Sequence, residues 1–189
     1  MNNQKRLTAE VFYRELVNKT LSSELGEYQK SKTWIRTMLE KVIKSILQNY
    51  SLKTEKEYFR IDMIGWIQKK TQLHNKCKKV NLNSHLWDLQ AAVEHENNSK
   101  AWLDEVCKLA YIRCPLRIVI GYGTENAEDK LSIANEILKD TKAFTDSDQE
   151  FAIILGERTD NFGKAKNNPC GFHCWVSTKT KEFTEIICQ

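Results

Sequence analysis

Apolar residues recur every three or four positions through the first fifty residues, a spacing that gathers them on one side of an α-helix. Thr8 stands where it can cap the first of these helices, which carries Val11, Phe12, Leu16 and Leu21. A second helix is expected over about residues 28–49, where apolar side chains repeat every four positions: Trp34, Met38, Val42 and Ile46. Residues 1–50 are therefore predicted to form a helical N-terminal part.

The period changes to two in two later segments, and this alternation predicts β-strands. In EYFRIDMIGWI, residues 57–67, Asp62 lies on the face opposite Phe59, Ile61 and Met63. In HLWDLQAAVEHE, residues 85–96, Glu94 and Glu96 lie opposite an apolar face of Trp87, Leu89, Ala91 and Val93. We expect these two strands to pair antiparallel, with a long lysine-rich connection between them.

The rest of the chain alternates between helix and strand patterns. Asn98 or Ser99 can cap a helix that carries Trp102 and Val106. The patterns that follow predict a buried strand, a helix, a second buried strand and two short edge strands: residues 114–122, 128–140, 150–157, 173–180 and 183–188. This order predicts an α/β fold in which a mixed β-sheet is flanked by helices on both faces, and residues 1–189 form a single domain.

Composition limits the class of protein without fixing its function. The 189 residues carry a formal net charge of +4, a mildly basic balance that permits nucleic acid as a partner but does not require it. No stretch reaches the roughly 18 apolar residues that a membrane span needs. The six cysteines are scattered rather than arranged as a secreted disulfide framework. We therefore expect a cytoplasmic protein with reduced thiols and no membrane association.

Three acidic residues carry the candidate chemistry. If the two alternating strands pair, Asp62, Glu94 and Glu96 converge on one side of the sheet. Clustered carboxylates repel one another and raise each other's pKa, a cost that a cation offsets. Hard oxygen ligands of this kind suit Mg²⁺ or Mn²⁺, which can activate water for attack on a phosphodiester. The alternative is that the acids belong to an ordinary solvated strand face.

The order of these elements resembles the PD-(D/E)XK nuclease superfamily, which has the restriction-endonuclease-like fold. The resemblance is carried by RID, a long connection, VEHEN, a helix and an apolar strand, and it covers about residues 50–125. It implies that Asp62 and Glu94 hold Mg²⁺ or Mn²⁺ and that the backbone carbonyl of His95 adds a ligand. Glu96 occupies the position where the superfamily usually has a lysine.

This departure leaves several roles open. Glu96 could act as general base or ligate a second metal ion. The missing positive charge could come from Lys100 or Lys108 on the next helix, although the pattern favours a solvated surface lysine at each position. The superfamily often places one more acid on an N-terminal helix, for which Glu15 and its rival Glu40 are the candidates.

Other motifs give weaker signals. Lysines fill the connection between the two motif strands and could contact phosphates or simply keep a loop soluble: Lys69, Lys70, Lys76, Lys78 and Lys79. CGFHC offers three potential zinc ligands but no second pair to complete a tetrahedral site: Cys170, His173 and Cys174. Gly121 and Gly123 lack the remaining residues of a dinucleotide or phosphate-loop fingerprint.

The sequence thus predicts a metal-dependent endonuclease that hydrolyses DNA, with a restriction or defence role implied by the family alone. One alternative is a catalytically altered nucleic-acid-binding or accessory module of the same fold. Another is an interaction protein whose helical N-terminus, with Trp34, docks a partner or a second copy. A two-fold homodimer is a common way to cut both strands of a duplex.

Overall fold

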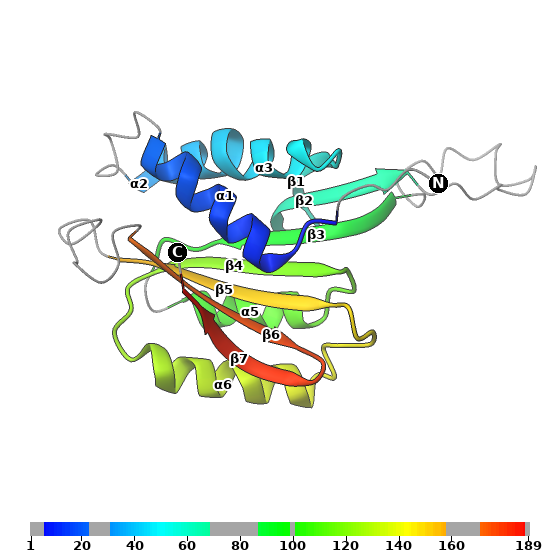
Figure 1. Ribbon diagram of the computed structural model, residues 1–189, viewed down its shortest axis with the longest axis vertical. Coiled ribbons are helices and arrows are strands. Elements are labelled where there is room, and N and C mark those ends of the chain that lie inside the picture. The colour runs from blue at the N-terminus through cyan, green and yellow to red at the C-terminus, as the bar shows by residue number, and fades with distance from the viewer. Residues whose placement is uncertain (1–5, 23–30, 69–86, 99–100, 158–170, 188–189) are drawn as a thin grey trace, which may run out of the picture.

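The computed structural model describes residues 6–22, 31–68, 87–98, 101–157 and 171–187. In this part of the chain one mixed sheet of seven strands lies between two layers of helices (Figure 1). The predicted α/β architecture, with a mixed sheet flanked by helices on both faces, is confirmed. Strands adjacent in sequence are also adjacent in the sheet, in the order β1-β2-β3-β4-β5-β6-β7.

The centre of the sheet is parallel and its two flanks are antiparallel. β3, β4 and β5 run parallel, whereas β1 with β2, β2 with β3, β5 with β6, and β6 with β7 are antiparallel. The strands are β1 (Lys53–Tyr58), β2 (Ile61–Gln68), β3 (Trp87–His95), β4 (Leu116–Tyr122), β5 (Glu150–Gly156), β6 (Phe172–Thr178) and β7 (Lys181–Ile186). The predicted antiparallel pairing of the two acid-bearing strands, β2 and β3, is confirmed.

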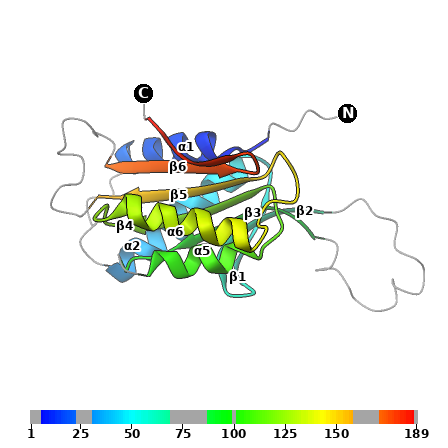
Figure 2. The same cartoon turned by 90° about the horizontal axis from the view of Figure 1, so that it is seen from below.

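Each face of the sheet has its own hydrophobic core. One face is covered by α1 (Ala9–Ser22), α2 (Ser31–Thr37), the π-helical segment η1 (Met38–Ile43) and α3 (Lys44–Asn49). The other is covered by α5 (Trp102–Ala110) and α6 (Ala127–Asp140), which connect the parallel strands (Figure 2). The second predicted N-terminal helix therefore exists as the consecutive segments α2, η1 and α3.

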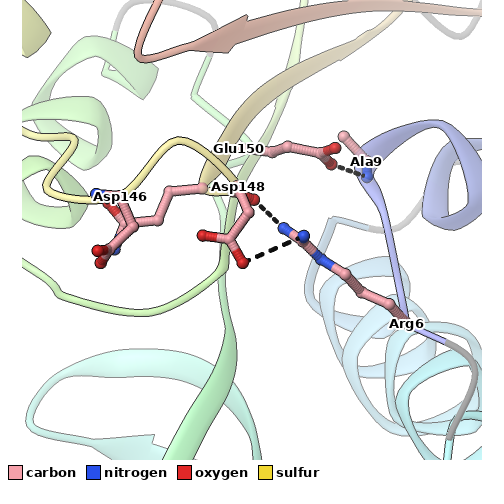
Figure 3. Close-up of polar contacts among 6 residues, drawn as sticks. Arg6, Ala9, Asp146, Asp148 and Glu150 are labelled. Atoms are coloured by element: carbon pink, nitrogen blue, oxygen red, sulfur yellow. Dashed lines mark hydrogen bonds and ion pairs between the residues drawn. The ribbon is translucent and has the colours of Figure 1, made fainter. Parts of the chain in front are cut away.

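The first helix is attached at its N-terminus to the amino end of β5. Thr8 caps it as predicted, since Thr8 Oγ1 accepts a hydrogen bond from Val11 N at 3.3 Å. The carboxylate of Glu150 accepts another from Ala9 N at 2.5 Å, and the guanidinium of Arg6 pairs with Asp148 (Figure 3). An acid at a helix N-terminus also interacts favourably with the helix dipole.

One segment that the sequence predicts as a single strand contains the turn of a hairpin. Residues 57–67 were expected to continue as a single strand, but β1 and β2 are joined by a two-residue turn at Phe59 and Arg60. Both turn residues have positive φ, 49° and 65° respectively. Such turns favour Asn-Gly, and a larger side chain in this conformation costs roughly 1–2 kcal/mol per residue. Phe59, expected to share a face with Met63, is instead 79% exposed.

The second predicted strand contains a bulge. Gly65 pairs with Ala91 but Trp66 pairs with Leu89, so Gln90 is the extra residue on β3. The prediction of one continuous apolar face is therefore wrong. Trp87 and Leu89, before the bulge, pack in the core with α5 and α6. Ala91 and Val93, after the bulge, pack in the core with the N-terminal helices. The bulge sets the face on which the end of β3 presents its side chains.

β4 contains a fully buried arginine. Arg117 Nη1 donates to Ala143 O at 2.7 Å, and its guanidinium lies over the ring of Phe144. Burial lowers the pKa of Arg117 to about 10. Within the described part of the chain, its Nε and Nη2 atoms have no hydrogen-bond partner. Ala143 O also accepts a hydrogen bond from Arg113 at 2.9 Å, so this carbonyl would keep a donor if Arg117 were replaced.

Arg117→Met is therefore expected to raise the free energy of unfolding by about 1–2 kcal/mol, because it replaces a desolvated charge by an apolar chain of similar length. Arg117→Ala serves as the control, since it leaves a cavity and should destabilise by about 2–4 kcal/mol. Urea unfolding at neutral pH measures both. Equal destabilisation by the two variants would show that the guanidinium itself stabilises the fold.

Several predicted features lie outside the described residues. These are Lys100, the lysines between the motif strands, and Cys170. The described zinc candidates have other neighbours: His173 Nδ1 lies 2.9 Å from Glu185 Oε1, and Cys174 is buried. Among the helices that are described, none is long and apolar enough to cross a membrane.

Candidate active site

The structure brings Asp62 and Glu94 together on the face of the sheet covered by α5. Asp62 is the second residue of β2, and Glu94 is the penultimate residue of β3. The register that pairs Met63 with Val93 makes the two acids neighbours across the antiparallel pair. Asp62 Oδ2 accepts a hydrogen bond from His95 N at 2.8 Å, so the end of one acidic strand fixes the carboxylate of the other.

The two carboxyl groups share a site that disfavours two negative charges. The pKa of Glu94 is raised to about 8: burial is the main cause, the charges of Asp62 and Glu105 add to it, and Lys108 opposes it. Burial also raises the pKa of Asp62, against hydrogen bonds from His95 N and Glu94. At neutral pH, a protonated Glu94 therefore donates to Asp62. A divalent cation would reverse this balance, because it favours the ionised form of both groups.

Lys108 of α5 supplies a positive charge directly at the acids. Its ammonium lies 2.9 Å from Glu94 Oε1 and also pairs with Glu105. It donates a third contact to Arg60 O, at 3.2 Å. Partial burial lowers the pKa of Lys108, but its contacts with Glu105 and Glu94 outweigh burial and raise that pKa overall. Of the two lysines that the sequence offered as a source of charge, Lys108 lies at the site and Lys100 is outside the described residues.

Glu96 has hydrogen-bond partners other than the two acids. Its backbone N donates to Ile120 O at 2.8 Å, which continues the pairing of β3 with β4. Its carboxylate accepts a hydrogen bond from Asn98 N at 2.6 Å. Among the described residues, no hydrogen bond or ion pair joins Glu96 to Asp62 or Glu94. Its role as general base stays a prediction.

Neither N-terminal acid reaches the site. Glu40 of η1 pairs with Arg36 at 3.0 Å and with Lys56 at 2.8 Å. These hydrogen bonds, first that from Lys56, lower the pKa of Glu40 to about 2. Glu15 belongs to α1. Both helices pack on the face of the sheet opposite α5, so neither of these two candidates lies beside Asp62.

His95 takes part through its backbone N–H, and its side chain lies on the other face of the sheet. His95 Nε2 is 2.8 Å from the hydroxyl of Tyr122, which accepts a hydrogen bond from Trp34 Nε1 at 2.6 Å. Burial lowers the pKa of His95 to about 4, so the ring is neutral and its Nε2 can accept a hydrogen bond from the Tyr122 hydroxyl. These buried hydrogen bonds fix the position of His95, whose backbone N–H donates to Asp62. One signal in the sequence pointed to it, a histidine on the apolar side of β3.

The geometry fits a metal site built from two carboxylates. In the described part of the chain, no three His, Cys, Asp or Glu side chains are arranged to hold a metal ion. Mg²⁺ commonly uses only one or two protein carboxylates and keeps several waters. Asp62 and Glu94 supply that number, and burial disfavours the negative charge that each would carry without a cation.

A pH-dependent stability follows from Glu94. A glutamate in the unfolded chain ionises near pH 4.5, whereas folded Glu94 ionises near pH 8. Between these values the folded state binds more protons, so the free energy of unfolding falls as pH rises, by at most about 1.4 kcal/mol per pH unit. Without metal, Glu94→Gln should therefore be more stable than wild type near pH 8, and this advantage should shrink toward pH 5.

Urea unfolding in the presence of a chelator, at several pH values, measures this difference. Added Mn²⁺ should then stabilise the wild type more than Glu94→Gln, since a ligand bound only to the folded state raises its stability. Parallel stability curves for the two proteins across this pH range would contradict the raised pKa.

No protein-family model matches the chain, and a search of curated proteins finds no relative. Relatives therefore give no functional assignment. A functional assignment must be based on the order of the strands and on the contacts of Asp62, Glu94 and Lys108.

Proposed function

We propose that the protein is a metal-dependent nuclease of the PD-(D/E)XK type that hydrolyses DNA phosphodiester bonds. One observation carries the proposal: two carboxyl groups from adjacent antiparallel strands, the half-buried Asp62 and the buried Glu94, meet beside a lysine ammonium. The surrounding order supports it, since β1, β2 and β3 are followed by α5 and then by β4, which is parallel to β3. This is the order that a restriction-endonuclease-like core would require.

The residues have distinct roles in the proposed reaction. When bound, Mg²⁺ or Mn²⁺ would lower the pKa of a coordinated water and offset charge on the phosphate. Asp62 would hold the ion in the orientation fixed by His95 N, and Glu94 would give up its proton to become the second ligand. Lys108 would offer its ammonium to a phosphate oxygen and stabilise the charge that develops there. Its position on α5 compensates for the glutamate at residue 96.

Cleavage of supercoiled plasmid DNA tests the proposal. Wild-type protein with Mn²⁺ or Mg²⁺ should convert the plasmid to nicked or linear forms, and a chelator should stop the reaction. A second candidate, a DNA-binding module without catalysis, is favoured by Lys108, whose ammonium lies 2.9 Å from Glu94 Oε1 and offsets part of the negative charge of the site without metal. Metal and DNA binding without cleavage would identify the module, and absence of metal binding would exclude both forms of the site. A restriction or defence role and a homodimeric assembly are further proposals that rest on the family resemblance.

A further inference from the structure

The turn between β1 and β2 combines exposure with an unfavourable backbone. Phe59 and Arg60 form the turn, and Glu57 before them also has positive φ, 55°. None of the three is glycine, although glycine or asparagine would adopt this conformation without the same steric conflict. Phe59 is 79% exposed at the tip. A strained turn that displays a large apolar side chain calls for an explanation other than stability.

The ring of Phe59 is supported from behind. It stands edge-on to the ring of Tyr58, with centroids 4.6 Å apart and an interplanar angle of 85°. Tyr58 in turn contacts Trp87 at 5.4 Å, and Trp87 stacks on Trp66 at 4.1 Å and 14°. The row of rings runs from the core beneath β2 and β3 to the tip of the hairpin. It holds Phe59 in place while most of the side chain stays open to solvent.

The hairpin tip adjoins the candidate active site. The ammonium of Lys108 that pairs with Glu94 also donates to the backbone carbonyl of Arg60, at 3.2 Å. Asp62 follows Arg60 by two residues. Arg60 and Phe59 are both exposed and are consecutive in a turn whose backbone contacts the lysine at the carboxylates. An aromatic face with an adjacent cation is the combination that recognises a nucleotide, since the ring stacks on a base and the cation binds its phosphate.

We propose that the tip of the β1–β2 hairpin binds an unpaired nucleotide, with Phe59 stacked on the base and Arg60 on the adjoining phosphate. This inference rests on the proposed nuclease function and narrows its substrate to DNA with a single-stranded or unstacked segment next to the scissile bond. A paired duplex keeps its bases stacked on one another and offers Phe59 no base face. The strain in the turn is then the consequence of displaying an aromatic residue where Asn-Gly would be more stable.

Fluorescence anisotropy with a labelled oligothymidylate of about 12 nucleotides, within the usual site sizes for single strands, tests the proposal. A duplex of the same length is the comparison probe. The whole chain of 189 residues is used with chelator at fixed ionic strength, because binding to phosphates depends on salt. Phe59→Ala should weaken single-strand binding about 5- to 150-fold and affect duplex binding much less, whereas Phe59→Trp should retain it. Ile187→Ala, at a residue 77% exposed beyond the opposite edge strand, is the matched control and should bind as wild type does.

A double variant separates recognition from folding. Phe59→Asn combined with Arg60→Gly should raise the unfolding midpoint and at the same time weaken single-strand binding. A purely structural hairpin would not give these opposite changes. Wild-type binding by Phe59→Ala, or no single-strand binding by the wild type, would overturn the inference even if the plasmid is cleaved. Single-strand binding that depends on Phe59, with no cleavage under any metal condition, would instead refute the nuclease and leave the nucleotide contact intact.

Discussion

Asp62→Asn is expected to lower the rate of Mn²⁺- or Mg²⁺-dependent DNA cleavage about 10³-fold or more, the scale of losing a group that stabilises transition-state charge. The amide has the size of the carboxylate and can still accept the hydrogen bond from His95 N, so the end of β3 should stay in place. What it lacks is the negative charge that a hard divalent cation needs. Conversion of supercoiled plasmid to nicked and linear forms, followed over time, measures the loss.

Glu40→Gln is the matched control for Asp62→Asn. It also replaces an acid by its amide, but Glu40 contacts Arg36 and Lys56 on the opposite side of the sheet. This variant should cleave at the wild-type rate. Cleavage by Asp62→Asn at the wild-type rate would remove Asp62 from the reaction, and an equal loss in both variants would trace the defect to folding or to general DNA affinity.

Lys108→Met should reduce kcat about 10²- to 10³-fold, because no ammonium would then face the charge that develops on the phosphate. The structure predicts a second effect. Lys108 lowers the pKa of Glu94, so its removal should raise that pKa and make the proton compete more strongly with the metal. The acidic limb of the pH–rate profile should therefore move to higher pH.

Lys108→Arg keeps the positive charge and should recover part of the rate and most of the pH profile. Lys56→Met is the control, since Lys56 pairs with Glu40 and lies away from the acids. A uniform loss of rate at every pH would show that Lys108 acts on the phosphate alone. Full activity in Lys108→Met would show that a group other than Lys108 supplies the positive charge for the reaction. Glu96→Gln, measured in parallel, tests the remaining prediction that Glu96 is the general base.

The proximity of Asp62 and Glu94 could be predicted because strand periodicity determines the face of the strand on which each acid lies. Alternation placed each acid opposite an apolar face, and two such strands in succession pair most simply as antiparallel neighbours. The buried strands β4 and β5 were also recognisable, since a parallel strand covered on both faces is apolar along its whole length. These features depend on local pattern and on few topological choices.

The hairpin and the bulge could not be predicted from the same pattern. A two-residue turn interrupts the alternation so briefly that Phe59 and Arg60 continue it, and they lack the Asn-Gly that would mark a turn. The residue that bulges, Gln90, is set by how β3 pairs with β2, which no local signal in β3 reveals.

The role of Lys108 depends on tertiary placement. In the sequence it was one of two candidate lysines on a helix, and the pattern favoured solvent exposure for each. Only the packing of α5 against β2 and β3 brings its ammonium to Glu94 and Arg60 O. The buried link from Trp34 through Tyr122 to His95 joins three elements far apart in sequence, and for the same reason no spacing rule could reveal it.

Calorimetric titration of the metal-free protein with Mn²⁺ at pH 7, in buffers of different ionisation enthalpy, tests the central claim most directly. Glu94 has a pKa of about 8 without metal, so binding one ion should release close to one proton to the buffer. Asp62→Asn should weaken the binding, and Glu94→Gln should bind more weakly and lose the proton release. Absence of binding by the wild type, or binding unchanged in both variants, would contradict the assignment of Asp62 and Glu94 as a metal site.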